Sequence, residues 1–299
     1  MTRDKWNERI ENAEAGFVPY LPKEEGYART VLEAMNYSIL AGGKRLRPQF
    51  IYASYRMLGG NDEMAVRPFM MAMEMIHTYS LVHDDLPAMD DDDYRRGRLT
   101  THKKYGEAMG ILAGDALLNA AYETAFRSFD SETSPEKIGA ALKVLGHKAG
   151  IYGMVGGQVV DVENNGCFVG ADMLTFVYEK KTAALIEASL MIGAILAGAT
   201  TEVVSLMEQV GTQIGIAFQI QDDILDVMGE EEVIGKPIHS DEKNQKTTYL
   251  SLYGLDKSRK KVEECTGKGL DTLNKISVVR EEEKKFLYDL LSSLVERER

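Results

Sequence analysis

The sequence has few cysteines, few prolines and no long apolar run. Its 299 residues include only Cys167 and Cys265, which are too few for a disulfide framework and lack a zinc-binding spacing. No run of 18 apolar residues occurs, and Met1 to Glu14 are largely polar and charged, so we expect no membrane span and no secretory signal. The expected location is therefore a reducing cytoplasm.

Positive charge is also in short supply. The chain carries 47 acidic and 35 basic side chains, which gives a net charge of −12 at pH 7. This balance argues against nucleic acid as a partner, because such proteins present a basic surface. It does not exclude a phosphorylated substrate, since carboxylates can hold divalent cations that in turn bind phosphate oxygens.

The scarcity of proline favours long helices. None of the seven prolines falls between Pro135 and Pro237, and none follows Pro237. Apolar residues recur at helical spacing in several stretches, one of which starts after Asp172, a plausible N-cap. Strand-like alternation is scarce, and we find no repeat or low-complexity linker. The sequence predicts an all-α fold, a single-domain bundle of roughly ten or more helices over residues 1–299.

Aspartates cluster directly after the apolar stretch from Ile76 to Val82. Asp84 and Asp85 are followed by four more at positions 90–93. The cluster could be a solvated loop, but charges at the mouth of a buried helix are costly unless they are paired or bind cations. Asp84 and Asp90 would lie about 120° apart on a regular helix. Pro87 should end the helix or make it bulge, which could bring Asp90 back toward Asp84.

A second cluster consists of Asp222, Asp223 and Asp226. Residues 222 and 226 are one turn apart on a helix face, and Ile220 and Ile224 flank them, so this face should point inward. Two inward acid pairs on separate helices suggest a shared metal site. Oxygen donors suit Mg²⁺, which keeps waters and binds phosphate oxygens.

Basic side chains accompany the acids. The segment from Gly42 to Pro48 places Lys44, Arg45 and Arg47 in a glycine-led turn, which could form an anion pocket or an ordinary basic surface turn. Arg95 and Arg96 directly follow the first acid cluster, and they could bind a ligand or simply balance its charge.

Two further residues stand out by their position on apolar helix faces. Lys181 lies on the apolar line of its helix, and because buried lysines almost always have a partner, it should reach a charged ligand or an acid. Thr182 beside it can add a hydroxyl contact. His77 lies two turns before Asp84, where it could be a hydrogen-bonded core residue or a ligand.

Together, these segments resemble the trans-isoprenyl diphosphate synthase family, of the bacterial farnesyl diphosphate synthase type. The resemblance extends from the turn Gly42–Pro48 to Asn244–Thr248. It rests mainly on the segments His83–Gly97 and Phe218–Asp226, which resemble the two aspartate-rich motifs of that family. The family fold implies an all-α bundle around a deep central cavity, and a homodimer.

The resemblance also implies the reaction. A family member of this type joins isopentenyl diphosphate head-to-tail to dimethylallyl or geranyl diphosphate and forms farnesyl diphosphate, by ionisation, condensation and elimination. About three Mg²⁺ ions, which Mn²⁺ can replace, would neutralise the leaving diphosphate. A dry cavity would protect the allylic cation from water, and the departed diphosphate would serve as the base.

The roles of individual residues follow from the same resemblance. Isopentenyl diphosphate would be bound by Lys44, Arg47, His77 and Arg96. The allylic diphosphate would be bound by Arg95, Lys181, Thr182, Gln219, Lys236 and Lys246. The metal ligands and their supports would be Asp84, Asp85, Asp90, Asp222 and Asp226. The catalytic group would comprise Lys181, Thr182, Gln219, Asp84 and Asp222, with Gln158 also facing the reacting carbons.

Product length should depend on the residues below Asp84. The bulky Tyr79, next to the small Ser80, favours a fifteen-carbon product in this family. A geranylgeranyl diphosphate synthase with a deeper cavity is the nearest alternative. A helical metal-dependent phosphohydrolase built on His83 and Asp84 would need further histidines. A non-catalytic synthase subunit usually lacks one acid motif, and a terpene cyclase lacks the basic turn.

Overall fold

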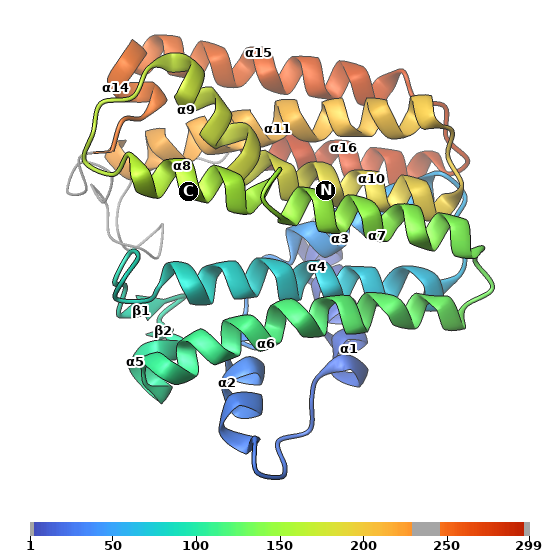
Figure 1. Cartoon of the computed structure of the whole chain (residues 1–299). Helices are drawn as coiled ribbons and strands as arrows, with labels where there is room; N and C mark the ends of the chain where they lie inside the picture. The colour runs from blue at the N-terminus through green and yellow to red at the C-terminus, as the bar shows by residue number, and fades with distance from the viewer. Residues whose placement is uncertain (1–2, 229–245, 296–299) are drawn as a thin grey trace. The chain divides into compact units, whose positions relative to one another are not determined.

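The computed structural model describes residues 3–228 and 246–295, and most of these residues are helical (Figure 1). The prediction of an all-α fold with ten or more helices is confirmed. In the described part of the chain, the only strands are β1 (Tyr94–Arg95) and β2 (Arg98–Leu99), which form one short antiparallel hairpin. None of the described helices is both long and apolar enough to cross a membrane.

The chain divides into two compact units. The N-terminal unit comprises Thr2–Tyr52 and Asp62–Ile138, and the C-terminal unit comprises Ala53–Asn61 and Gly139–Arg299. The prediction of a single domain over residues 1–299 and of a central cavity stays a prediction.

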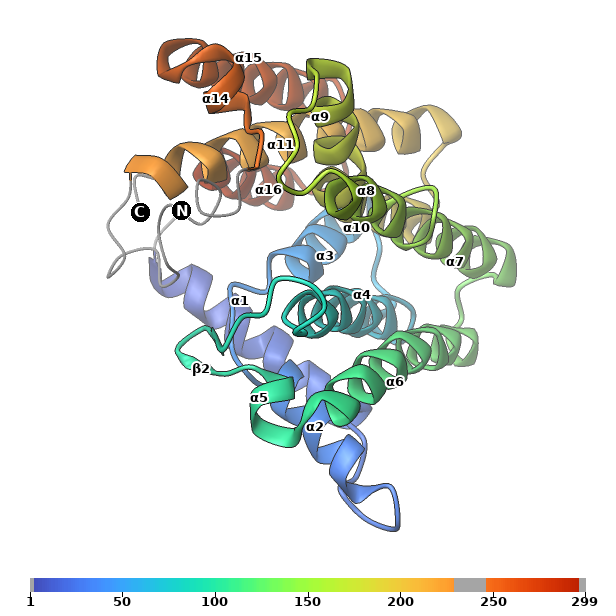
Figure 2. The same cartoon turned by 60° about the vertical axis from the view of Figure 1, so that its left-hand side comes forward.

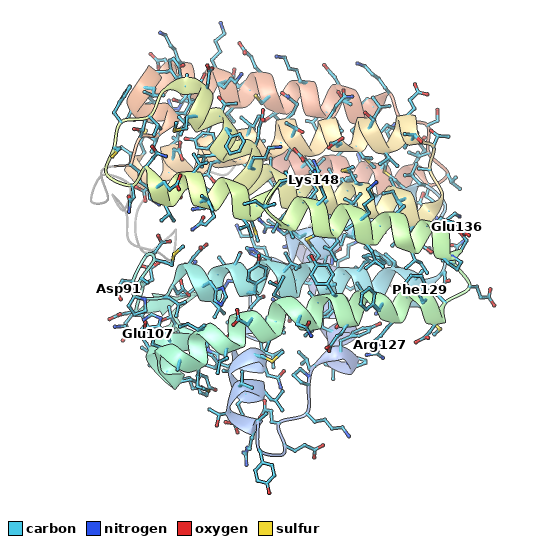
Figure 3. The ribbon with its side chains drawn as sticks, in the orientation of Figure 1. Asp91, Glu107, Arg127, Phe129, Glu136 and Lys148 are labelled. Carbon is cyan, nitrogen blue, oxygen red and sulfur yellow. The ribbon has the colours of Figure 1, made fainter. Side chains whose placement is uncertain are left out.

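The N-terminal unit is built around a pair of long helices, α4 and α6, which pack along each other (Figures 1 and 2). Its helices are α1 (Arg3–Phe17), η1 (Val18–Tyr20), α2 (Arg29–Ile39), the start of α3 (Leu46–Met57), α4 (Glu63–Asp84), α5 (Thr101–Tyr105), α6 (Glu107–Phe126) and η2 (Arg127–Asp130). Phe69, Ile76 and Leu117 are fully buried in its core. Asp91 lies at one end of this helix pair and Phe129 at the other, so the acidic loop occupies one end of the unit (Figure 3).

The C-terminal unit is organised around α11, which packs against α10 and α15. Its elements are most of α7 (Pro135–Ala149), α8 (Met154–Glu163), α9 (Ala171–Val177), a π-helix (Tyr178–Ala183), α10 (Ala184–Ala197), α11 (Thr201–Met228), α14 (Tyr249–Tyr253), α15 (Leu255–Asn274) and α16 (Glu281–Val295). The predicted N-cap of α9 is wrong, because Gly170 occupies that position. Asp172 lies in the first turn, where its charge still favours the positive helix end.

Glycines let α8 and α11 approach the π-helix closely. A Cβ atom on Gly215 would lie 2.3 Å from the Cβ of Ala183, and one on Gly157 would lie 2.3 Å from the backbone nitrogen of Lys181. Both distances are too short for non-bonded atoms. The missing side chains of these glycines therefore allow the π-helix, which carries Lys181 and Thr182, to pack closely between α8 and α11. Short π-helical turns occur frequently at functional sites.

Candidate active site

The chain folds back on itself after α4. The helix ends at Asp84, and the backbone N–H of Asp90 donates a hydrogen bond of 2.8 Å to the carbonyl of Asp84. Asp91 adopts a φ of 52°, a left-handed conformation that aspartate tolerates better than most residues. The predicted break near Pro87 is thus confirmed, and it returns the backbone of Asp90 to that of Asp84.

Asp85 and Arg95 form a tight ion pair in this loop. The side chain of Asp85 is buried, and its Oδ1 lies 2.7 Å from Nε and 2.5 Å from Nη2 of Arg95. Burial raises the pKa of Asp85, and the charge of Arg95 opposes that rise. Arg95 thus contributes charge balance to the acid cluster, and its binding of the allylic diphosphate stays a prediction. Metal binding by Asp85 stays a prediction.

Arg96 lies against the basic turn. Its Nη1 donates to the carbonyl of Gly42, and a Cβ atom on Gly43 would lie 2.7 Å from the Cζ of Arg96. Gly42 and Gly43 have φ values of 83° and 128°, which side chains rarely adopt. The two glycines therefore make the turn and leave room for the guanidinium. Lys44, which follows them, is exposed.

The charge of Arg96 influences both His77 and Arg47. Burial, together with the charges of Arg47 and Arg96, keeps the pKa of His77 well below its ordinary value, so the ring is neutral at pH 7. Burial lowers the pKa of Arg47 to about 10, which leaves it charged at neutral pH. Its buried Nε has no hydrogen-bond partner among the described residues. A buried donor without a partner is costly, and an anionic oxygen would satisfy it.

Arg45 is the residue of the turn whose role the sequence did not reveal. It is 3% exposed and has a φ of 48°. Its Nη1 lies 2.6 Å from Oε1 of Glu74, its Nε lies 2.9 Å from Oε1 of Glu14, and its Nη2 donates to the carbonyl of Ile39 at 2.8 Å. Arg45 therefore ties the basic turn to α1, α2 and α4 instead of facing a ligand.

Tyr79 and Ser80 lie on α4 just before Asp84. Tyr79 is 7% exposed, and its ring packs edge-to-face on His83 with centroids 5.9 Å apart. Burial, Tyr122 and Asp84 raise the pKa of its phenol to about 12. The hydroxyl of Ser80 donates to the carbonyl of His77 at 2.9 Å. A buried aromatic close to Asp84 agrees with the predicted limit on product length, which stays a prediction.

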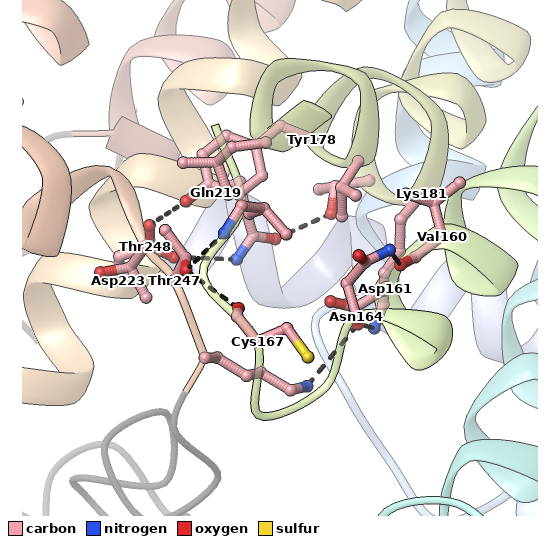
Figure 4. Close-up of a pocket in the computed structure, with 15 residues that line it drawn as sticks. Val160, Asp161, Asn164, Cys167, Tyr178, Lys181, Gln219, Asp223, Thr247 and Thr248 are labelled. Carbon is pink, nitrogen blue, oxygen red and sulfur yellow. Dashed lines mark hydrogen bonds and ion pairs between the residues drawn. The ribbon is translucent and has the colours of Figure 1, made fainter. Parts of the chain in front are cut away.

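The C-terminal unit contains a cavity of about 100 Å³ that brings two predicted lysines together (Figure 4). The Nζ of Lys181 lies 2.5 Å from Oδ2 of Asp161, and the Nζ of Lys246 lies 3.6 Å from the same oxygen. Burial acts to raise the pKa of Asp161, but the two lysines outweigh it and keep that pKa below its ordinary value. The prediction that Lys181 reaches an acid is confirmed. Asp161 itself was missed, because its position on α8 does not reveal which residues it meets.

A second set of hydrogen-bonded side chains lines the same cavity (Figure 4). Thr182 donates from Oγ1 to Oε1 of Gln219 at 2.8 Å, and the Nε2 of Gln219 lies 3.2 Å from Oδ1 of Asp223. Asp223 also accepts from the hydroxyl of Tyr178 and from the backbone N–H of Tyr249. Thr182 and Gln219, which the sequence named separately, are therefore direct partners. Asp223 and Tyr178 orient them, and neither residue had a predicted role.

The remaining predicted residues are placed as follows. Asp226 is 2% exposed and Asp222 is half-buried on the same helix, α11. Gln158 is half-buried on α8. Lys236 lies outside the described residues.

One group of described side chains is compact enough to bind a metal ion. Asp91, Asp93 and His102 place ligand atoms within 4.8 Å of one another. Within residues 3–228 and 246–295, the predicted ligands Asp84, Asp85, Asp90, Asp222 and Asp226 form no such group of three. Their donors are all carboxylate oxygens, which is the chemistry that Mg²⁺ prefers, and the turn after α4 brings two of the residues together.

Comparison with known proteins agrees with this arrangement. Residues 28–282 match the family described as "Polyprenyl synthetase". Farnesyl diphosphate synthase of Geobacillus stearothermophilus is 41% identical over 86% of this chain and 86% of its own length. The chloroplastic geranylgeranyl pyrophosphate synthase of Catharanthus roseus is 44% identical over 81% of this chain and 67% of its own length.

A solved structure extends the similarity to nearly every residue. Geranyltransferase from Helicobacter pylori, complexed with magnesium and isoprenyl diphosphate, superposes with a TM-score of 0.87 at 30% identity, over 98% of this chain and 97% of its own. The predicted family and prenyl transfer as the class of reaction are confirmed. The chain belongs to the polyprenyl synthetase family, the trans-isoprenyl diphosphate synthases.

Proposed function

We propose that this protein condenses isopentenyl diphosphate with dimethylallyl and geranyl diphosphate to give farnesyl diphosphate. The observation that carries the proposal is the presence of two separate cation groups. Arg47 and Arg96 gather around the neutral His77 in the N-terminal unit, whereas Lys181 and Lys246 meet in the cavity of the C-terminal unit. A reaction that joins two diphosphate esters needs two such groups.

The isopentenyl diphosphate would be held by the basic turn and its neighbours. Lys44, Arg47 and Arg96 supply positive charge, and the spare Nε donor of Arg47 can take a phosphate oxygen. His77 is neutral, so it can hydrogen-bond to the substrate without adding charge. The anchored position of Arg45 keeps the turn in place before a ligand arrives, which lowers the entropic cost of binding.

The allylic diphosphate would be held by Lys181, Lys246 and Arg95, with Lys236 as a further candidate. These cations stabilise the negative charge that develops on the leaving diphosphate. Thr182 and Gln219, fixed by their hydrogen bond, would border the reacting carbons. Exclusion of bulk water from the reacting carbons would protect a carbocation from hydrolysis.

The carboxylates would bind Mg²⁺, about three ions in all, and Mn²⁺ could replace it. Asp84 and Asp90 would be ligands in one unit, Asp222 with support from Asp226 in the other. When bound, these ions would supply charge neutralisation of the diphosphate as its bond to the allylic carbon breaks. The crystallised geranyltransferase from Helicobacter pylori contains magnesium together with isoprenyl diphosphate, which supports this assignment.

We further propose that the protein is a cytoplasmic homodimer. Ile111 and Leu112 on α6 are 42% and 49% exposed. On α8, Val155, Val159 and Val162 form a second exposed apolar stripe at helical spacing. Unpaired faces of this kind mark interaction surfaces, and a second copy of the chain is the partner we propose. The two free cysteines suit a reducing compartment.

Product sizing tests the proposed function. Purified protein is incubated with labelled isopentenyl diphosphate and geranyl diphosphate in Mg²⁺, and the dephosphorylated products are separated by chain length. We expect a fifteen-carbon product that disappears with a chelator. A main product of twenty carbons would indicate a geranylgeranyl diphosphate synthase, as one of the relatives is named. Phosphate release without elongation would support a phosphohydrolase and contradict the proposal.

A further inference from the structure

Asp161 occupies the position between the two lysines of the cavity. Its Oδ2 lies 2.5 Å from the Nζ of Lys181 and 3.6 Å from the Nζ of Lys246 (Figure 4). The three side chains are only 21–27% exposed, so water screens them partly. The other carboxylate that lines this cavity, Asp223, is instead held by Tyr178, Gln219 and the backbone of Tyr249.

The charge of this triad is smaller than its lysines suggest. Two ammonium groups and one carboxylate give a net charge of +1 instead of +2. A diphosphate oxygen that approaches either lysine meets the carboxylate of Asp161 on the same ammonium groups. The incoming oxygen must displace that carboxylate or share the two lysines with it. If it shares them, the negative charges of the diphosphate and of Asp161 repel each other.

We propose that Asp161 is the counterion of Lys181 and Lys246 when no diphosphate is bound. In this role it weakens the binding of a diphosphate that carries no metal, and it thereby promotes the release of inorganic diphosphate after each turnover. The inference rests on the proposed function only in taking this cavity as a diphosphate site. It predicts that a diphosphate binds strongly only when metal ions add positive charge. Inorganic diphosphate, once separated from its metal ions, then dissociates easily.

Calorimetric titration with inorganic diphosphate in the presence of a chelator tests the proposal. Asp161→Asn keeps the size of the side chain and removes its charge, so we expect the dissociation constant to fall about tenfold, a value moderated by solvent screening. Asp161→Glu keeps the charge and should bind as weakly as the wild type. Glu163→Gln makes the same charge change at an exposed position of α8 and should leave the constant unchanged.

Unchanged or weaker binding by Asp161→Asn would overturn the proposal, because it would mean that Asp161 orients the lysines for the ligand. Equal tightening by Glu163→Gln would also overturn it, since a general effect of net charge would then explain the result. If Asp161→Asn does not fold, Asp161→Ser carries the same expectation. Elongation by the wild-type protein is measured separately, so a failure of the proposed function is seen independently of this titration.

Discussion

The two cation groups of this protein are held in different ways. In the N-terminal unit, the turn before Arg47 is anchored by Arg45, which pairs with Glu74, and the side chains of Arg45 and Glu74 are at most 3% exposed. In the C-terminal cavity, Lys181 shares Asp161 with Lys246, and these side chains are 21–27% exposed. A planar guanidinium can bind several acceptors at fixed angles, whereas an ammonium is a mobile point charge. The comparison indicates a firmly anchored basic turn in one unit and a partly exposed ion pair in the other.

The largest effect should come from removing carboxylates of the proposed metal site. We expect Asp84→Ala and Asp222→Ala each to lower kcat by about a thousandfold or more, because the leaving diphosphate would lose metal-borne charge stabilisation. The measurement is the initial rate of chain elongation at saturating Mg²⁺. Asp130→Ala, an exposed change in η2, is the control and should keep the wild-type rate. A rate within tenfold of the wild type for either aspartate variant would remove that residue from the proposed metal site.

The next largest effect concerns the anchored basic turn. Glu74→Gln leaves the buried charge of Arg45 poorly compensated, so we expect the free energy of unfolding to fall by about 3 kcal/mol. The KM for isopentenyl diphosphate should rise about tenfold as the basic turn loosens. Glu14→Gln removes the half-exposed partner of the same arginine and should cost less than about 1 kcal/mol. Urea unfolding and steady-state kinetics measure both quantities, and equal losses in the two variants would contradict a special role for Glu74.

Tyr79 should affect product length more than rate. Its buried ring lies close to Asp84, so Tyr79→Ala opens space below the acid loop, and we expect products longer than fifteen carbons. The elongation rate should stay within about tenfold of the wild type, because no binding group is removed. Chain-length analysis of the products measures the effect. If the products remain at fifteen carbons, Tyr79 does not limit their growth.

A smaller effect should appear in the pH dependence of stability. The folded pKa of His77 lies below the unfolded value of 6.5, so the unfolded chain binds the extra proton as the pH falls below 6.5. The free energy of unfolding should therefore fall by about 1–2 kcal/mol between pH 7 and pH 5 on account of this residue. His77→Gln should lose less stability over that interval than the wild type in urea titrations. His147→Gln, at an exposed position, should retain the wild-type dependence.

The sequence predicted local features of the site better than the contacts between residues of different helices. The break after Asp84 follows from the missing N–H of Pro87, and the need of Lys181 for a partner follows from its apolar surroundings. The identity of that partner could not be predicted, because Asp161 comes from another helix and helix packing is not encoded in spacing along the chain. The π-helix also has no sequence signature, and it alters which side chains share a face.

The most direct test of two separate diphosphate groups is the pair of Michaelis constants measured in two variants. Arg47→Ala should raise the KM for isopentenyl diphosphate at least about tenfold and leave the KM for geranyl diphosphate within about twofold. Lys181→Ala should do the reverse. If each variant raises both constants to the same extent, the two cation groups do not serve separate substrates, and the proposed division of the site is contradicted.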